Sequence, residues 1–294
     1  MSDDHNSGAE QRSHGATGRV HSRIGKDLGP RVLSGLVLAA GVIAMTLAGS
    51  LPFAVLMAAV GGVVAWEWGR IVRGIDADVV MAAHVGTVVA AVVLAYGSLP
   101  GLAVLAIAIG VILVALLSFG RHGILSATGV AYAALPAVAL IWLRSDALLG
   151  ASAVLFVILV VAAADTSAYF AGRLLGGPKL WARISPNKTW AGLVGAVIGG
   201  LGAGLLTGYW IAGASPAWLM LLGAGLAIVA QAGDLAESAL KRNFGTKDAS
   251  ALIPGHGGFM DRVDGLVTAS VAAAIIAALI NLQAPAQALL LGRL

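Results

Sequence analysis

Long apolar runs recur along this 294-residue chain and limit its fold more than any other feature. Each run is about 17–25 residues long, the length that a helix needs to cross a hydrocarbon core of about 30 Å. The composition agrees, because 59% of the residues are hydrophobic, 11% are charged and the mean hydropathy is +0.92. A soluble domain needs more polar surface than this. The sequence therefore predicts an all-α, polytopic integral membrane protein.

About nine transmembrane helices can be drawn on the chain. They run near 32–49, 51–68, 79–96, 101–119, 124–143, 148–170, 190–212, 216–235 and 265–282. A turn signal, Gly49-Ser50-Leu51-Pro52, separates the first two segments. The alternative, one long kinked helix of about 36 residues, exceeds a single span.

The basic residues test this count. With the N-terminus inside, sixteen of the eighteen Lys and Arg residues fall on the inner side, and only Arg144 and Arg293 fall outside. Cytoplasmic loops of membrane proteins carry an excess of Lys and Arg. The partition therefore predicts an N-in, C-out topology with cytoplasmic loops at 171–189 and 236–264.

The chain divides into three regions. Residues 1–30 are polar and lack the apolar core of a secretory signal, so we expect a disordered cytoplasmic tail. Residues 31–143 hold the N-terminal transmembrane helices, and residues 144–294 hold a C-terminal transmembrane catalytic region with both polar loops. Cysteine is absent, which excludes disulfides and thiolate metal sites.

Polar chemistry concentrates at the end of the eighth segment. If that helix continues into the loop, four side chains share one of its faces: Asp234, Glu237, Ser238 and Lys241. Such a stripe suits a metal-bound phosphate, because carboxylates bind the metal and ammonium groups bind phosphate oxygens. The alternative is an interfacial helix end whose charges pair with one another.

Two more motifs follow in the loop 236–264. Gly255-His256-Gly257-Gly258 offers backbone that a ligand can approach closely, and a plain turn between helices is the alternative. Asp261 and Asp264 flank Arg262 on one helix face. They suit metal or phosphate binding, with N-terminal capping of the ninth helix as the alternative.

A second polar block surrounds the loop 171–189. Asp165 lies inside the sixth segment, where an unpaired carboxylate is costly, so it is a functional candidate unless it pairs with Arg173. Ser185-Pro186 is predicted to cap and begin the seventh helix. Lys188 and Thr189 would then lie in its first turn, near N–H groups that favour anions.

These blocks resemble a known family. The run from Ser238 to Asp264, SALKRNFGTKDASALIPGHGGFMDRVD, resembles the signature of the phosphatidate cytidylyltransferases (CDP-diacylglycerol synthases), with its fixed polar positions filled. The stretch from Asp165 to Gly192, with AYFAGR and SPNKTW, is similar to the family's other block, and Trp66-Glu67-Trp68 is similar in a less specific way. Ala191 departs from the pattern, because many members have Glu there.

The resemblance implies that CMP passes from CTP to phosphatidic acid, giving CDP-diacylglycerol and pyrophosphate. The phosphate of the lipid is the nucleophile, so the reaction needs charge neutralisation and in-line positioning rather than a protein base. The implied cofactor is Mg²⁺, with K⁺ as a candidate second cation. The implied partners are CTP, phosphatidic acid and membrane lipids, without nucleic acid, and a homodimer is compatible. The implied location is a bacterial-type inner membrane, with the active site facing the cytoplasm.

The resemblance also implies roles for single residues. The implied catalytic residues are Asp234, Ser238, Lys241, Asp261 and Asp264, of which Asp234, Asp261 and Asp264 hold the metal. The implied substrate-binding residues are Asp165, Arg173, Lys179, Ser185, Lys188, Thr189, Arg242, Lys247, His256 and Arg262.

Three other classes of membrane protein compete with this interpretation. A secondary transporter would show inverted repeats and charges near the middle of the bilayer, and neither is evident in the sequence. A CDP-alcohol phosphotransferase would carry its own Asp-Gly-x-x-Ala-Arg pattern, which is absent from the sequence. Another CTP-dependent lipid nucleotidyltransferase or a lipid kinase stays open. Release of pyrophosphate rather than CDP would separate a cytidylyltransferase from a kinase.

Overall fold

The structure, a computed structural model, describes residues 35, 37–120, 122–250, 252 and 257–293. The predicted tail 1–30 and the candidate residue His256 lie outside the described residues.

Helices make up most of the described chain. In order, the elements are α2 (Ser50–Arg73), α3 (Val79–Tyr96), α4 (Pro100–Leu117), α5 (Gly123–Arg144), α6 (Gly150–Leu174), β1 (Lys179–Trp181), β2 (Ser185–Thr189), α7 (Trp190–Trp210), α8 (Pro216–Asn243), α9 (Met260–Ile280) and α10 (Pro285–Leu291). A short apolar helix, Val37–Ala48, precedes α2.

Eight of the described helices, α2 to α9, are long and apolar enough to cross a membrane. They correspond to the second to ninth predicted segments, and this confirms an all-α, multi-pass architecture. The first predicted segment is helical over Val37–Ala48, and part of its range lies outside the described residues. The break at Gly49, between that helix and α2, agrees with the predicted turn.

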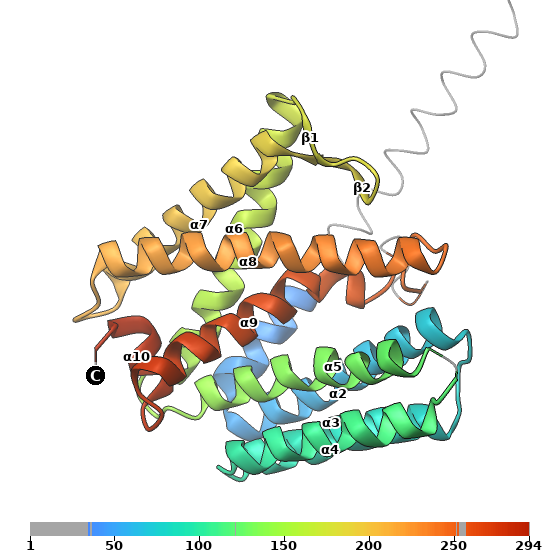
Figure 1. The fold of residues 1–294 in the computed structure, drawn as a ribbon. Helices are drawn as coiled ribbons and strands as arrows, with labels where there is room; N and C mark the ends of the chain where they lie inside the picture. Colours follow the sequence, from blue (N-terminus) through green and yellow to red (C-terminus); the bar gives the residue numbers. More distant parts are fainter. Residues whose placement is uncertain (1–34, 36, 121, 251, 253–256, 294) are drawn as a thin grey trace, which may run out of the picture.

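The helices form two groups with α9 between them. In Figure 1, α2 to α5 lie together on one side, α6 and α7 lie on the other, and α8 and α9 run between them. One buried apolar cluster is built mainly from α2 to α5, and a second mainly from α6 to α10. α9 packs against α8 and also against α5, so its residues meet both groups.

Small residues bring α7 and α8 close together. A Cβ atom on Gly200 of α7 would lie 2.8 Å from the Cβ atom of Ala227 of α8, closer than real Cβ contacts come. Helices in a bilayer associate through such close packing, because lipid tails are as apolar as their side chains. This packing anchors α8, which carries Asp234, Glu237, Ser238 and Lys241.

The loop after α6 contains a β-hairpin that the sequence did not predict. β1 and β2 pair antiparallel, with Lys179 opposite Thr189 and Trp181 opposite Ser185. The prediction that Ser185-Pro186 caps the seventh helix was therefore wrong. The N-cap is Thr189, whose Oγ1 accepts a hydrogen bond from the Gly192 N–H at 3.0 Å. Thr is a good N-cap, and a two-stranded hairpin tolerates a proline because both of its strands are edges.

The polar stripe of α8 lies within one continuous helix. α8 runs to Asn243, and α9 begins at Met260. The condition that placed Asp234, Glu237, Ser238 and Lys241 on one helix face is therefore met. The loop between α8 and α9 is correspondingly shorter than the predicted range 236–264.

Candidate active site

A first group of polar side chains lies where α6, β2 and α8 meet. The Nζ atom of Lys188 lies 2.6 Å from Oδ2 of Asp234 and donates to the carbonyl oxygen of Gln231 at 3.3 Å. The side-chain amide of Gln231 donates to Oδ1 of Asp165 at 2.9 Å. These contacts join the two polar blocks of the sequence into one site.

Asp165 does not pair with Arg173, which was the alternative considered from the sequence. Arg173 donates instead to the hydroxyl of Tyr169 at 3.2 Å, with its guanidinium 6.0 Å from the centre of that ring. Asp165 bonds to Gln231 of a different helix. The residue is therefore part of the shared group and not of a local ion pair.

Asp264 of α9 belongs to the same group. Its carboxylate interacts electrostatically with Asp234, Glu237 and Asp165, and its Oδ1 accepts the N–H of Gly265 at 2.7 Å. Carboxylates that share a small volume repel one another, so such a cluster favours a cation.

A glycine allows α8 and α9 to meet beside these carboxylates. A Cβ atom on Gly233 would lie 2.6 Å from Cγ2 of Thr268, so no larger residue fits without displacement. Thr268 also donates from Oγ1 to the carbonyl oxygen of Val229 at 3.1 Å. The close contact lies directly beside Asp234 in the sequence and sets its distance from α9.

A second group adjoins the first and is more deeply buried. The Nζ atom of Lys241 donates to Oε1 of Glu237 at 2.9 Å and pairs with Oδ1 of Asp261. The hydroxyl of Tyr132, on α5, donates to Oε2 of Glu237 at 3.3 Å. Lys241 was predicted to bind phosphate, and in the structure its ammonium group lies between two carboxylates.

Asp261 is fully engaged by protein groups. Its Oδ1 pairs with Lys241, and its Oδ2 accepts the N–H of Ala249 at 3.0 Å and the N–H of Gly258 at 2.9 Å. Asp261 therefore joins Ala249, in the interior of the loop between α8 and α9, to Gly258 near its α9 end. A metal role for Asp261 would compete with these contacts and stays a prediction.

The other predicted residues divide into those at the site and those away from it. Ser238 is at the site, where its Oγ lies 3.4 Å from Oδ1 of Asp234. Arg242 is exposed and donates to the carbonyl oxygen of Thr246 at 3.1 Å. Away from the described contacts of the cluster lie Arg173, Lys179, Ser185, Arg242 and Lys247, and Arg262 is exposed. Thr189 caps α7, as described above.

Three residues of the site were missed from the sequence: Glu67, Tyr132 and Gln231. Glu67 of α2 is 0% exposed and accepts hydrogen bonds from Ser250, Phe259 and Met260. An isolated carboxylate within an apolar span is a functional candidate by default, and that signal could have identified Glu67. Tyr132 and Gln231 carry no comparable signal.

The oxygen donors suit magnesium better than a metal that needs a full protein cage. The described residues contain no group of three or more His, Cys, Asp or Glu side chains placed to hold a metal ion. Mg²⁺ commonly binds through one or two carboxylates together with substrate phosphates and water. A magnesium site at Asp234 and Asp264 would need only this smaller set of protein ligands and stays a prediction.

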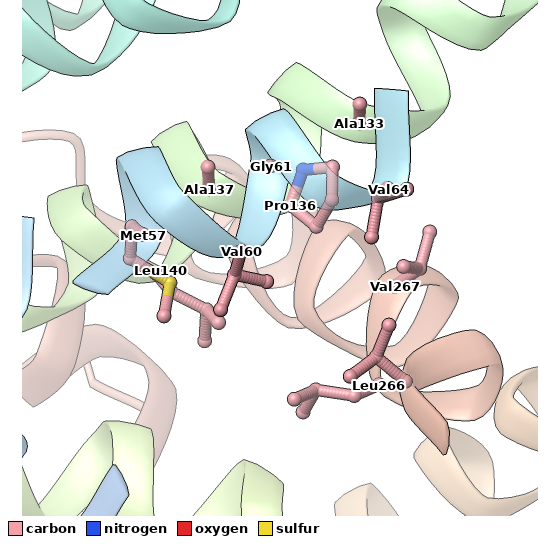
Figure 2. Close-up of a pocket in the computed structure, with 11 residues that line it drawn as sticks. Met57, Val60, Gly61, Val64, Ala133, Pro136, Ala137, Leu140, Leu266 and Val267 are labelled. Carbon is pink, nitrogen blue, oxygen red and sulfur yellow. The ribbon is translucent and has the colours of Figure 1, made fainter. Parts of the chain in front are cut away.

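An apolar cavity of about 30 Å³ lies between α2, α5 and α9. Figure 2 shows its walls, which include Val60, Pro136 and Leu266. A cavity without polar partners does not hold water firmly and offers nothing to a nucleotide. It therefore belongs to the packing that supports α9 and not to a site for a charged substrate.

Comparisons with known proteins identify the family of the chain. The model of the cytidylyltransferase family matches residues 29–280. A phosphatidate cytidylyltransferase of Brucella abortus biovar 1 is 48% identical over 144 residues, which cover 49% of this chain and 53% of that protein. Those of Mycobacterium leprae (43% over 124 residues; 42% and 40% covered) and Staphylococcus haemolyticus (44% over 125; 42% and 47%) are also similar. The chain thus spans about half the length of the curated relatives it matches.

Proposed function

The chain belongs to the cytidylyltransferase family, and from that premise we propose that it transfers CMP from CTP to phosphatidic acid. The products would be CDP-diacylglycerol and pyrophosphate. The observation that carries the proposal is the meeting of Asp165, Lys188, Asp234 and Asp264, from both polar blocks, among helices long enough to cross a membrane. The names of the matched relatives support the same activity.

The reaction brings one phosphate anion up to another, so the site must neutralise charge and align the two groups. Asp234 and Asp264 would hold Mg²⁺, with K⁺ as a candidate second cation, and the metal supplies positive charge against the phosphate oxygens. The ammonium group of Lys188 would add a positive charge beside a phosphate oxygen, because it already lies next to the carboxylate of Asp234. Gln231 of α8 would hold both neighbours in place, because its side-chain amide donates to Asp165 and its backbone carbonyl oxygen accepts from Lys188.

The orientation is also part of the proposal. The predicted positive-inside partition places both polar blocks on the cytoplasmic side, where CTP is available. The hairpin adds support, because Lys179 and Arg183 are exposed on it. We place the protein in a bacterial inner membrane with this end facing the cytoplasm.

The test uses the purified full chain with phosphatidic acid in mixed micelles and CTP labelled in its α-phosphate, with Mg²⁺ varied from zero. We expect labelled CDP-diacylglycerol together with an equal amount of unlabelled pyrophosphate. Both should form only with Mg²⁺. Release of CDP would indicate a lipid kinase instead, and transfer to a lipid other than phosphatidic acid would indicate another lipid nucleotidyltransferase. No transfer under any of these conditions would refute the proposal.

Two variants test the metal assignment in the same assay. Asp234→Asn and Asp264→Asn keep the side-chain shape but remove the charge, so each should lower turnover at least about 100-fold and raise the Mg²⁺ requirement of any residual activity. The matched control is Asp248→Asn, which changes an exposed carboxylate in the nearby loop and should leave turnover normal. Normal kinetics in either site variant would remove that residue from the assignment.

A further inference from the structure

Glu67 is a fully buried carboxylate that lies outside both polar blocks of the sequence. Its Oε1 accepts the N–H of Phe259 at 2.8 Å and the hydroxyl of Ser250, and its Oε2 accepts the N–H of Met260 at 2.5 Å. The three donors lie 183 to 193 residues away in the sequence. Glu67 therefore links α2 to the start of α9 by hydrogen bonds.

The contacts of Glu67 interlock with those of Asp261. Asp261 accepts the N–H groups of Ala249 and Gly258. Glu67 accepts hydrogen bonds from the residue that follows each of them in the chain, Ser250 and Phe259. Two carboxylates therefore join the same two parts of the loop between α8 and α9, residues 249–250 in its interior and residues 258–259 at its α9 end. Movement at one carboxylate should be felt at the other.

The energetics favour a specific role over simple packing. The N-terminus of α9 has no side-chain cap from its own N-cap residue, Phe259, and Glu67 supplies the acceptors from another helix. A buried carboxylate costs several kcal/mol unless hydrogen bonds or a cation compensate it. The nearest cations of α2, Arg70 and Arg73, pair with Asp76 and Asp78. The hydrogen bonds from the loop and from α9 are thus what stabilises Glu67.

We propose that Glu67 is a positioning residue for the transfer reaction. It holds Ser250 of the loop beside the start of α9, the helix that carries Asp261 and Asp264. The kinetic part of this inference rests on the proposed function, and the structural part does not.

The experiment compares Glu67→Gln with a matched variant elsewhere on α2 and α3. Asp78→Asn removes a salt bridge to Arg73 of α2 and the cap of α3, without touching the loop. For each protein we would measure the melting temperature, hydrogen exchange of the amides at 258–260, and kcat and KM for CTP. Hydrogen exchange can be measured on a protein that transfers no CMP, so it reports on the loop even if the proposed function fails.

Glu67→Gln should raise the exchange rate at Phe259 and Met260 at least about tenfold, because one carboxylate oxygen becomes an NH₂ group that cannot accept an N–H. It should lower kcat about 10–100-fold, the usual cost of losing a residue that orients a site, with KM for CTP nearly unchanged. Asp78→Asn should lower the melting temperature but leave exchange at 258–260 and kcat as in the wild type.

Each other outcome has a defined meaning. A Glu67→Gln protein that melts earlier but keeps wild-type exchange and kcat would overturn the proposal and leave Glu67 a structural residue. Faster exchange in a chain whose wild type transfers no CMP would refute the proposed function and keep the loop contact. If Glu67→Gln does not fold, Ser250→Ala decides, because it removes only one donor. It should give severalfold faster exchange and lower kcat, and wild-type values would overturn the proposal.

Discussion

Lys241 offers the sharpest test of how the site is built. Its ammonium group lies between Glu237 and Asp261, and the Lys241 and Glu237 side chains are 11% and 0% exposed. The sequence predicts a phosphate-binding lysine, whose loss would lower turnover and leave the fold intact. The structure predicts that Lys241→Met also destabilises the protein, because two buried carboxylates would lose their shared cation.

The expected magnitude follows from the burial of the three groups. Removing one partner of a buried ion pair costs about 3–5 kcal/mol, because it leaves an uncompensated charge. At roughly 2–4 °C per kcal/mol for a chain of this size class, the melting temperature should fall by about 6–20 °C. The neighbouring Arg242 is exposed, so Arg242→Met should cost only about 0–1 kcal/mol.

The assay is thermal unfolding in one detergent, with turnover measured on the same samples. Adding Glu237→Gln to Lys241→Met removes one of the two uncompensated carboxylate charges. We therefore expect the double variant to recover more than half of the decrease in melting temperature. If turnover returns as well, Lys241 acts by compensating the charge of Glu237; if only stability returns, the reaction itself needs the ammonium group, at Asp261 or at the phosphates. A Lys241→Met protein that melts within about 2 °C of the wild type would refute the ion-pair argument.

Three further predictions concern a close helix contact, a helix cap and the membrane topology. Gly233→Ala should cost about 1–3 kcal/mol and lower turnover, because the new methyl group meets α9 beside the aspartate cluster, whereas Gly225→Ala on the same helix faces open space and should be neutral or stabilising. Thr189→Ala should lower the free energy of unfolding by about 1 kcal/mol through loss of the α7 cap, measured by denaturation. In intact cells, a cysteine at Asn243 should resist an impermeant thiol reagent and one at Ala212 should react. Both positions are exposed and the chain has no native cysteine, so the opposite labelling pattern would reverse the topology.

The helices and part of the site could be predicted from the sequence because their signals are local. The ranges predicted for 79–96 and 190–212 nearly match α3 and α7, since the length of an apolar run depends on neighbouring residues alone. The shared face of Asp234 and Ser238 is also local, because helical spacing determines which side chains align.

The hairpin and the partners of the charged groups depend on contacts that are distant in the sequence. Ser185-Pro186 has the composition of a helix start, and only its pairing with β1 decides that it is a strand. Lys241 resembles an interfacial lysine in the sequence, and its two carboxylate partners become evident only when α8 and α9 are packed together. Local patterns do not contain the rotation of one helix against another, so they do not specify these partners.

The same reasoning explains why the N-terminal helices matter for chemistry that the C-terminal half carries. α2 and α5 each bring one of the described polar side chains to the site. Glu67 accepts from Ser250 and Phe259, which are next in the chain to the residues that bind Asp261, and Tyr132 donates to Glu237, which pairs with Lys241. The apolar packing of α2 and α5 against α9 fixes those two side chains, so apolar contacts in one half position charges in the other. A change that loosens this packing should therefore appear first as a loss of turnover, because small displacements of aligned groups reduce rate before they unfold a helix bundle.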